Sequence, residues 1–197
     1  ANVVLKLSLF TLLPMISAML LYRHEIIALL SGGKFPQAAD FLYFFSIWLV
    51  LQAAHFVLGL IALAYEDAIS ILFGSLFALL GIVVGFLLMK VWGVSGMGWG
   101  LVLSEVIWCS TVAKVLVGKG AKIQLDWLNN GKMLLVAAFA AALVYLLPWG
   151  ASNVFILGLL SGVVCLVFLG VLFFLKPFSS EERALINKLL PKPWFVW

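Results

Sequence analysis

The sequence predicts an all-α integral membrane protein with six transmembrane helices and a short C-terminal helix in the interface. Its composition is the first indication: 65% of the 197 residues are hydrophobic, only 10% are charged, and the mean hydropathy is +1.23. A soluble domain has roughly 25% charged residues. The second indication is a set of six apolar runs, each long enough to cross about 30 Å of hydrocarbon at about 1.5 Å per residue.

The six predicted spans are joined by connections too short to hold a folded soluble domain. The spans lie near residues 3–22, 41–64, 69–91, 96–117, 133–149 and 154–175. The sequence begins ANVVLKL, with neither Met nor a signal-peptide pattern, so we expect it to be a portion of a longer protein. The expected organisation is four helices in 1–117, a loop in 118–132, two accessory helices in 133–175 and an amphipathic tail in 176–197.

The lysines and arginines predict which side of the membrane each connection occupies. Most of them fall on the side of the N-terminus, the loop after the fourth span and the tail, and by the positive-inside rule both ends are therefore cytoplasmic. The formal charge of +4 is concentrated on that side, and we expect no nucleic-acid partner. The residues on the first side are Lys6, Lys114, Lys119, Lys122, Lys132, Lys176, Arg183, Lys188 and Lys192; those on the other are Arg23, Lys34 and Lys90.

The tail contains the pattern that starts many helices. Ser179 is followed three residues later by Glu182, which predicts a capping box. Leu185 and Ile186 share one face of the following segment, while Arg183 lies on another. These positions predict a short amphipathic helix in the cytoplasmic interface.

Small residues recur along the spans at the spacing that brings membrane helices together. Helices in lipid gain little hydrophobic free energy by touching each other, so close backbone packing must supply part of their association. Four sets of small residues have this spacing, and we expect each set to form a packing seam. The sets are Gly74, Ala78, Gly81 and Gly85; Gly96 and Gly100; Ala137, Ala138, Ala141 and Ala142; and Gly158 and Gly162.

Pro14 lies inside the first span and removes a backbone donor there, so a kink or local break is expected. Such breaks mark moving segments in some transporters and simple bends in many other membrane helices. Outside the spans, Gly32 and Gly33 predict a turn. Glu66 and Asp67, between the second and third spans, are most simply explained as solvated, although they could hold a cation.

The fourth span carries an acidic residue, Glu105, near its middle. A central acidic residue costs about 2.5–3.5 kcal/mol on the insertion scale, whereas each Leu, Ile or Val returns only about 0.3–0.6 kcal/mol. We therefore expect this span to turn Glu105 toward the bundle interior or toward water. The helix face that carries Glu105 also carries Trp108, Cys109 and Val112, and Ser104 and Thr111 flank this face.

The second span has a polar stripe at the spacing of one helix face. Trp48, Gln52, His55 and Gly59 stand at i, i+4, i+7 and i+11. Indole, amide and imidazole groups suit a polar cavity that offers hydrogen bonds and stacking surfaces, as sugar or headgroup binding requires. The simpler explanation is that the stripe bonds to a neighbouring helix and holds the bundle together. The candidates for a substrate cavity or for coupling are Glu105, His55, Gln52, Trp48 and Trp108.

No pattern in the sequence predicts an enzyme. The longest connection is about 18 residues, and the chain has no HExxH, no GxSxG, no carboxylate pair spaced for glycosyl transfer and no phosphate-binding Gly-Lys loop. Cys109 and Cys165 both lie in apolar runs, where a thiol acts as a small hydrophobe. We expect no metal and no cofactor.

Three stretches resemble polysaccharide flippases of the multidrug/oligosaccharidyl-lipid/polysaccharide exporter superfamily. LPMISAMLLYRHEIIALLSGGKFPQAADFLYFFSIWLVLQ, residues 13–52, has the proline-bearing helix, the "EII-x-LL-x-G" turn and the "F/Y-x-x-A" motif. WGVSGMGWGLVLSE is similar to the glycine entry into the next helix, although Met97 and Gly98 replace the usual two alanines. FSSEERALINKLLPKP is similar to the tails of these proteins.

This resemblance implies that the chain is the C-terminal portion of a two-lobe transporter in a bacterial-type plasma membrane. The whole protein would move lipid-linked oligosaccharide by alternating access, with membrane lipids and an N-terminal lobe as its partners. One alternative is an ion-coupled exporter of small molecules in the same superfamily, with Glu105 as a proton or cation site. Another is a scaffold subunit, in which Gln52, His55 and Glu105 contact helices of the lobe and face no open cavity.

Overall fold

A computed structural model describes residues 2–121, 123, 126–146 and 153–189, and over these the regular elements are all α-helices. Six of the helices are long and apolar enough to cross a membrane, as the sequence predicted. The chain is therefore a multi-pass helical membrane protein. The helices are α1 (Asn2–Leu21), α2 (Arg23–Ser31), α3 (Ala38–Ala64), α4 (Ala68–Trp92), α5 (Val94–Gly118), α6 (Trp127–Tyr145), α7 (Val154–Leu175) and α8 (Ser180–Leu189).

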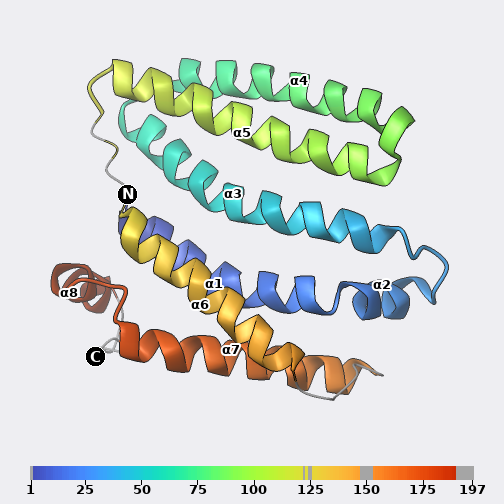
Figure 1. Ribbon diagram of the computed structural model, residues 1–197. Coiled ribbons are helices and arrows are strands. Elements are labelled where there is room, and N and C mark those ends of the chain that lie inside the picture. Colours follow the sequence, from blue (N-terminus) through green and yellow to red (C-terminus); the bar gives the residue numbers. More distant parts are fainter. Residues whose placement is uncertain (1, 122, 124–125, 147–152, 190–197) are drawn as a thin grey trace.

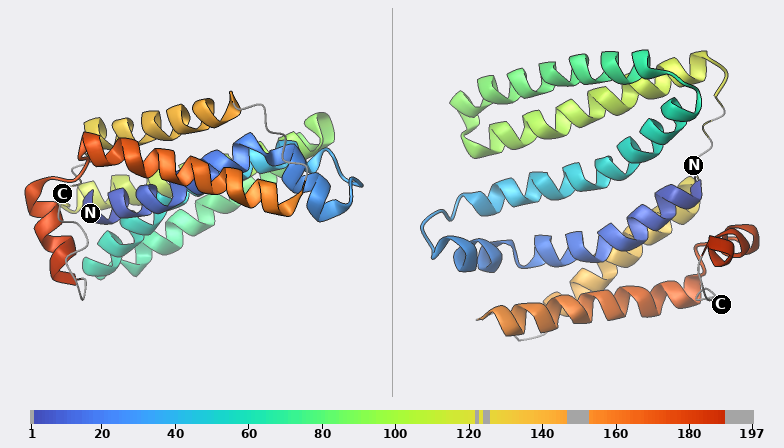
Figure 2. Two further views of the ribbon diagram at one scale, coloured as in Figure 1. Left: turned by 90° about the horizontal axis from the view of Figure 1, so that it is seen from below. Right: turned by 180° about the vertical axis from the view of Figure 1, so that it is seen from behind.

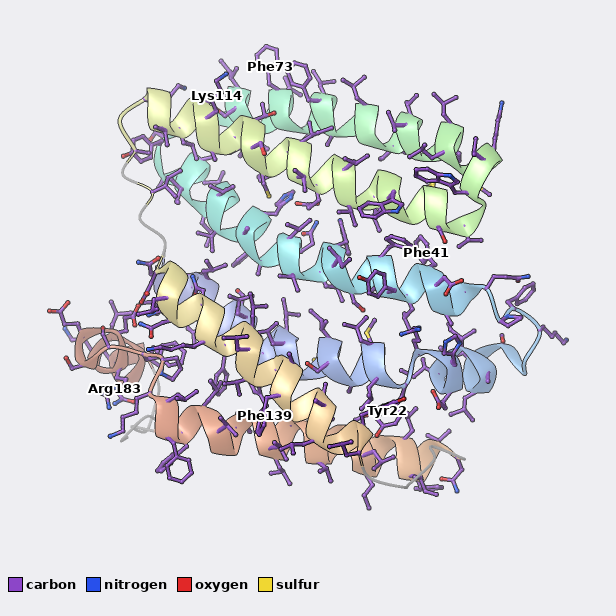
Figure 3. All side chains as sticks on the ribbon, viewed as in Figure 1. Tyr22, Phe41, Phe73, Lys114, Phe139 and Arg183 are labelled. Atoms are coloured by element: carbon purple, nitrogen blue, oxygen red, sulfur yellow. The ribbon has the colours of Figure 1, made fainter. Side chains whose placement is uncertain are left out.

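The long helices lie side by side in an open array (Figure 1). The order across the array is α4, α5, α3 and α1, followed by α6 and α7, and the view from behind shows the same order (Figure 2). The start of α1 lies at the same end as α8, which we call the terminal end, and α2 lies at the other end, which we call the α2 end. Helix α4 forms one edge, and its Phe73 points away from α5 (Figure 3).

Helix α6 begins at Trp127, earlier than the predicted start near residue 133. The Asp126 side chain caps this helix by accepting a hydrogen bond from the Asn129 backbone N–H at 3.2 Å. Polar residues between Asp126 and Lys132 therefore belong to the first turns of α6, and the expected loop 118–132 is correspondingly shorter. The predicted end of this span, 147–149, lies outside the described residues.

Glycines bring α4 and α5 into backbone contact, as predicted. A Cβ added at Gly85 would lie 2.8 Å from Cα of Gly100, and one added at Gly81 would lie 2.5 Å from Cα of Ser104. These positions leave no room for a side chain, because the neighbouring atoms belong to the backbone. The seam joins the two helices along much of their length and fixes the rotation of α5 about its axis.

The seams predicted in the last two spans are wrong or only partly correct. A Cβ added at Gly158 or Gly162 of α7 would meet nothing within 4 Å. Helix α7 instead packs with larger side chains, which form the stripe Leu160, Val164, Phe168 and Leu172. On α6, Ala137 is buried but Ala138 and Ala142 are exposed. The periodicity of small residues therefore did not identify the buried face of these helices.

Helix α1 has no break at Pro14, and a kink at this proline stays a prediction. Helix α1 continues without a break from Asn2 to Leu21, through the buried Pro14, and Tyr22 separates it from α2. Helix α2 ends at Gly32, which has φ +60° and is followed by Gly33 with φ +78°. This left-handed pair confirms the predicted turn, because glycine adopts positive φ without steric cost.

Lys6 ties four segments together at the terminal end. Only 1% of its side chain is exposed, and its Nζ lies 2.7 Å from the Asp126 carboxylate and 2.8 Å from that of Glu182. Nζ also donates to the carbonyl oxygen of Pro177 at 3.1 Å. Glu182 accepts from the Ser179 N–H at 2.8 Å, while the Ser179 hydroxyl accepts from the Glu182 N–H, which confirms the predicted capping box of α8.

Asp67 is buried and paired, so the expectation that it is solvated was wrong. Its side chain is 1% exposed and lies 2.8 Å from Nζ of Lys119, which follows α5. It also caps α4 by accepting from the Ser70 N–H at 3.1 Å. The hydrogen bond from Lys119, assisted by the Ser70 hydroxyl, lowers the pKa of Asp67 from 3.8 to about 2. Asp67 therefore fastens the start of α4 to the end of α5.

Gly85→Val should destabilise the protein by about 1–3 kcal/mol, because the added side chain must push the α4 and α5 backbones apart. Gly162→Val is the matched control, since it makes the same change in a helix where the Cβ meets open space. Thermal unfolding in mild detergent, followed by circular dichroism, measures both. Equal midpoints for the two variants would contradict the α4–α5 seam.

Asp67→Asn should flatten the acid dependence of stability. The native pKa of Asp67 lies below its ordinary value, so its pairing with Lys119 stabilises the fold above about pH 4 and is lost as the pH falls toward 2. The thermal unfolding midpoint should therefore fall further between pH 5 and pH 2 in wild type than in Asp67→Asn. The asparagine keeps a capping side chain but cannot titrate. Glu66→Gln, at the exposed neighbouring position, should follow wild type; identical slopes in all three proteins would refute the assignment.

Candidate functional site

Helices α3 and α5 bring the predicted polar residues into one cluster within the membrane-spanning part of the protein. Trp48, Gln52 and His55 lie on one face of α3, and Glu105 and Trp108 lie on the facing side of α5. Glu105 is only 6% exposed. The prediction that α5 turns this carboxyl group away from lipid is therefore confirmed.

One carboxylate oxygen of Glu105 accepts two hydrogen bonds from α3. Nε1 of Trp48 donates to Oε2 at 3.1 Å, and Nε2 of Gln52 donates to the same atom at 2.8 Å. An indole nitrogen can only donate, so Oε2 acts as an acceptor whatever the protonation state of the carboxyl group. These two bonds set the depth of Glu105 relative to α3.

The other oxygen of Glu105 meets His55. Nδ1 of the imidazole lies 2.5 Å from Oε1, which leaves room for a single proton between the two atoms. The imidazole is stacked on the buried Trp108, with ring centroids 3.5 Å apart and planes inclined by 4°. The side chain of His55 is nevertheless 34% exposed, and its Nε2 has no hydrogen-bond partner within the described residues. His55 therefore links the buried carboxyl group to the surroundings of the protein.

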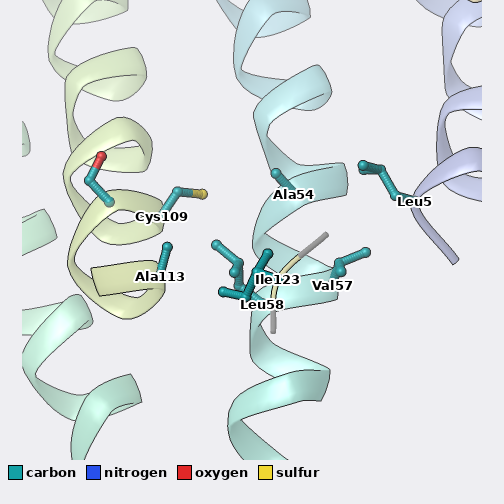
Figure 4. Close-up of a pocket in the computed structure, with 8 residues that line it drawn as sticks. Leu5, Ala54, Val57, Leu58, Cys109, Ala113 and Ile123 are labelled. Atoms are coloured by element: carbon teal, nitrogen blue, oxygen red, sulfur yellow. The ribbon is translucent and has the colours of Figure 1, made fainter. Parts of the chain in front are cut away.

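An apolar pocket of about 260 Å³ opens next to this cluster. Figure 4 shows it between Cys109 and Ala113 of α5, Ala54 of α3 and Leu5 of α1. The Cys109 thiol lines the pocket and also lies 3.8 Å from Oε1 of Glu105, at the distance of a weak sulfur hydrogen bond. The pocket lies toward the terminal end, because Leu5 stands near the start of α1 and Ala113 near the end of α5.

The arrangement fits both explanations that the sequence left open. Direct hydrogen bonds from α3 to Glu105 hold two helices of the same unit together, as a purely structural cluster would. The exposed edge of His55 and the adjoining pocket give the cluster access to a proton or to a ligand. Gly59, the fourth member of the stripe, is not in close contact with another helix, since a Cβ there would meet nothing within 4 Å.

The sequence analysis does not predict the Lys6 cluster. It places Lys6 among the positive charges of one membrane side and Asp126 in the loop 118–132. The available signal was a lysine inside an apolar span with acidic residues in the flanking connections, since a buried ammonium requires a charged partner. This signal does not indicate which acidic residues pair with Lys6, because Asp126 and Glu182 are distant from Lys6 in the sequence.

No family model, curated protein or solved structure matches this chain.

Replacing Glu105 by leucine should destabilise the protein by about 2 kcal/mol or more, because Trp48, Gln52 and His55 would lose their hydrogen-bond partner inside the membrane. Glu105→Gln keeps one acceptor oxygen and should therefore lose less stability than Glu105→Leu. Ser110→Leu, at an exposed position of α5, is the control for an added apolar side chain. Unfolding midpoints in detergent provide the measurement, and a Glu105→Leu protein as stable as wild type would show that the cluster does not hold α3 to α5.

Proposed function

We propose that this membrane protein is one lobe of a transporter and that its substrate is a lipid-linked oligosaccharide. The observation that carries the proposal is the convergence of Trp48, Gln52 and His55 on Glu105 within the transmembrane array. A polar cluster at this depth costs insertion free energy, and ionisable groups inside membranes commonly mark transport pathways. The substrate class is suggested by the resemblance of residues 13–52, of the glycine entry at 92–105 and of the tail to polysaccharide flippases.

The chemistry of the cluster suits the polar part of such a substrate. Trp48 and His55 offer ring surfaces for stacking, and the Gln52 amide can exchange hydrogen bonds with hydroxyl groups. The apolar pocket beside Cys109 provides space for part of a hydrocarbon chain, as a substrate with a lipid tail requires. A lipid-linked sugar would thus meet a polar and an apolar surface within one lobe.

The proposed orientation places the terminal end in the cytoplasm. Lys114, Lys119, Lys132 and Lys176 all belong to helix ends or connections on that side, and the positive-inside rule assigns such a side to the cytoplasm. The α2 end would then face outward. In this orientation α8 lies at the cytoplasmic surface, held there by the ion pair between Lys6 and Glu182.

A second lobe would complete the transporter. Helices α4 and α7 stand at opposite edges of the open array and keep most of their surfaces exposed. In the two-lobe arrangement that the resemblance implies, the substrate cavity lies between lobes and opens alternately to each side. The N-terminal lobe is accordingly the proposed partner of this one.

A second candidate function is the export of small molecules coupled to protons. The favouring observation is the 2.5 Å approach of His55 Nδ1 to Glu105 Oε1, with Nε2 of the same ring without a partner within the described residues. A proton on this pair could be gained or lost through Nε2 without breaking the two bonds to Oε2. The same pair could drive oligosaccharide export, so the two candidates differ in substrate.

The decisive experiment reconstitutes the two-lobe protein into proteoliposomes and measures transport directly. A labelled lipid-linked oligosaccharide is incorporated, and its arrival in the opposite leaflet is followed by accessibility to an added glycosidase. Wild type should move the substrate, and Glu105→Gln and His55→Phe should lower the rate at least about tenfold. Glu66→Gln, an exposed carboxyl group outside the cluster, should leave the rate unchanged.

The alternatives predict different results in the same vesicles. A protein that ignores the oligosaccharide but expels a small molecule when a pH gradient is imposed would be the proton-coupled exporter. A protein that moves neither, in wild-type form and with its fold intact, would be a scaffold. Either result would overturn the flippase proposal.

A further inference from the structure

A polar pocket of about 320 Å³ lies at the α2 end, far along α3 and α5 from the Glu105 cluster's pocket at the terminal end. Its walls come from the first turns of three helices: Arg23 of α2, Asp40 and Tyr43 of α3, and Ser95 of α5. Asp40, Tyr43 and Ser95 lie near the starts of two membrane-crossing helices, and Arg23 closely follows the end of a third, α1. The pocket therefore lies at the depth of the lipid headgroups. No residue of this pocket takes part in the site described above.

Arg23 has more hydrogen-bonding capacity than the protein uses. Its Nη1 donates to the Leu20 carbonyl oxygen at 3.4 Å, which is a long hydrogen bond, and its Nε is buried with no partner among the residues that the structure describes. A guanidinium group carries five N–H donors, and burying one of them unpaired costs free energy. The side chain therefore lies beside the pocket with N–H donors for which the described residues supply no acceptor.

Asp40 places a negative charge on the wall of the same pocket. Among the described residues it forms no ion pair with Arg23 or with any other cation, although both side chains line one cavity. Two opposite charges that face a shared space without meeting form a complement to a ligand that carries both charges. A simple anion would be repelled by Asp40, and a simple cation would be repelled by Arg23.

The other lining residues supply hydroxyl groups and an aromatic ring. Tyr43 and Ser95 have hydroxyls, and Phe44 also lines the pocket. The ring of Phe44 packs on Tyr43 and Trp99, at centroid distances of 5.4 and 5.3 Å. These ring contacts hold the Phe44 side chain against α5.

We propose that this pocket binds the zwitterionic headgroup of an aminophospholipid, with the phosphate on Arg23 and the ammonium group on Asp40. Ser95 and Tyr43 donate further hydrogen bonds to the phosphate oxygens. Phosphoethanolamine fits this arrangement better than phosphocholine, because its ammonium has N–H donors for the Asp40 carboxylate and a quaternary ammonium has none. The proposal goes beyond the transport function and does not depend on it.

The test titrates the purified full chain in detergent with short-chain phosphatidylethanolamine or phosphatidylcholine, and records binding as the shift in thermal midpoint. Wild type should bind phosphatidylethanolamine about tenfold more tightly than phosphatidylcholine, the ratio that one charge-assisted hydrogen bond supplies. Asp40→Asn should abolish this preference. Arg23→Gln should weaken the binding of both lipids at least about tenfold. Lys34→Gln removes a cation on the same side but outside the pocket, and it should change neither affinity.

Several outcomes would overturn the proposal. Equal affinity of wild type for the two lipids would do so, and so would an unchanged preference in Asp40→Asn, a result that stays informative if Arg23→Gln fails to fold. Inorganic phosphate or a soluble sugar phosphate that binds as tightly as phosphatidylethanolamine would show that the pocket takes a free phosphate or a glycan. A loss of oligosaccharide transport with this lipid preference intact would bear only on the proposed function.

Discussion

A carboxyl group near the middle of a membrane span must be enclosed by protein, and the burial of Glu105 against α3 is the contact on which the rest of the array depends. Three side chains from α3 converge on it, and this fixes which face of α5 points to α3. The glycine face of the same helix then points to α4, where Gly100 meets Gly85 across the backbones. Helix α5 thus joins two neighbours by different means, hydrogen bonding on one side and close packing on the other.

The terminal end is held by charged pairs in addition to apolar contacts. The Lys6 ammonium is buried between Asp126 and Glu182, so the start of α1, the start of α6 and the helix α8 share one ion-pair cluster. The hydrogen bond from Lys6 also lowers the pKa of Asp126 to about 2, which keeps this carboxylate charged over a wide pH range. The ion pair between Asp67 and Lys119 likewise joins the start of α4 to the end of α5. Charged pairs of this kind are specific, because removing either partner leaves the other buried and unpaired.

These two constraints shape what the protein can do. The interior of the array is tied together at Glu105, yet His55 extends the cluster to an exposed edge beside an apolar pocket. The α2 end carries a separate polar pocket whose charges are not used by the fold. The protein therefore has two polar regions at different depths, one in the middle of the array and one near its α2 end.

The sequence by itself determined the six spans, the inward face of Glu105, the turn at Gly32 and Gly33 and the capping box of α8. Each of these depends on local physics: hydropathy over a span, the cost of one carboxyl group in lipid, or a hydrogen bond between residues close in the chain. Only the tertiary structure decided that Gln52 and His55 meet Glu105, that Lys6 pairs with Asp126 and Glu182, and that Asp67 is buried. It also decided that Gly158 and Gly162 face open space while Gly85 does not, because a small residue shows where helices can approach and only the assembled helices show where they do.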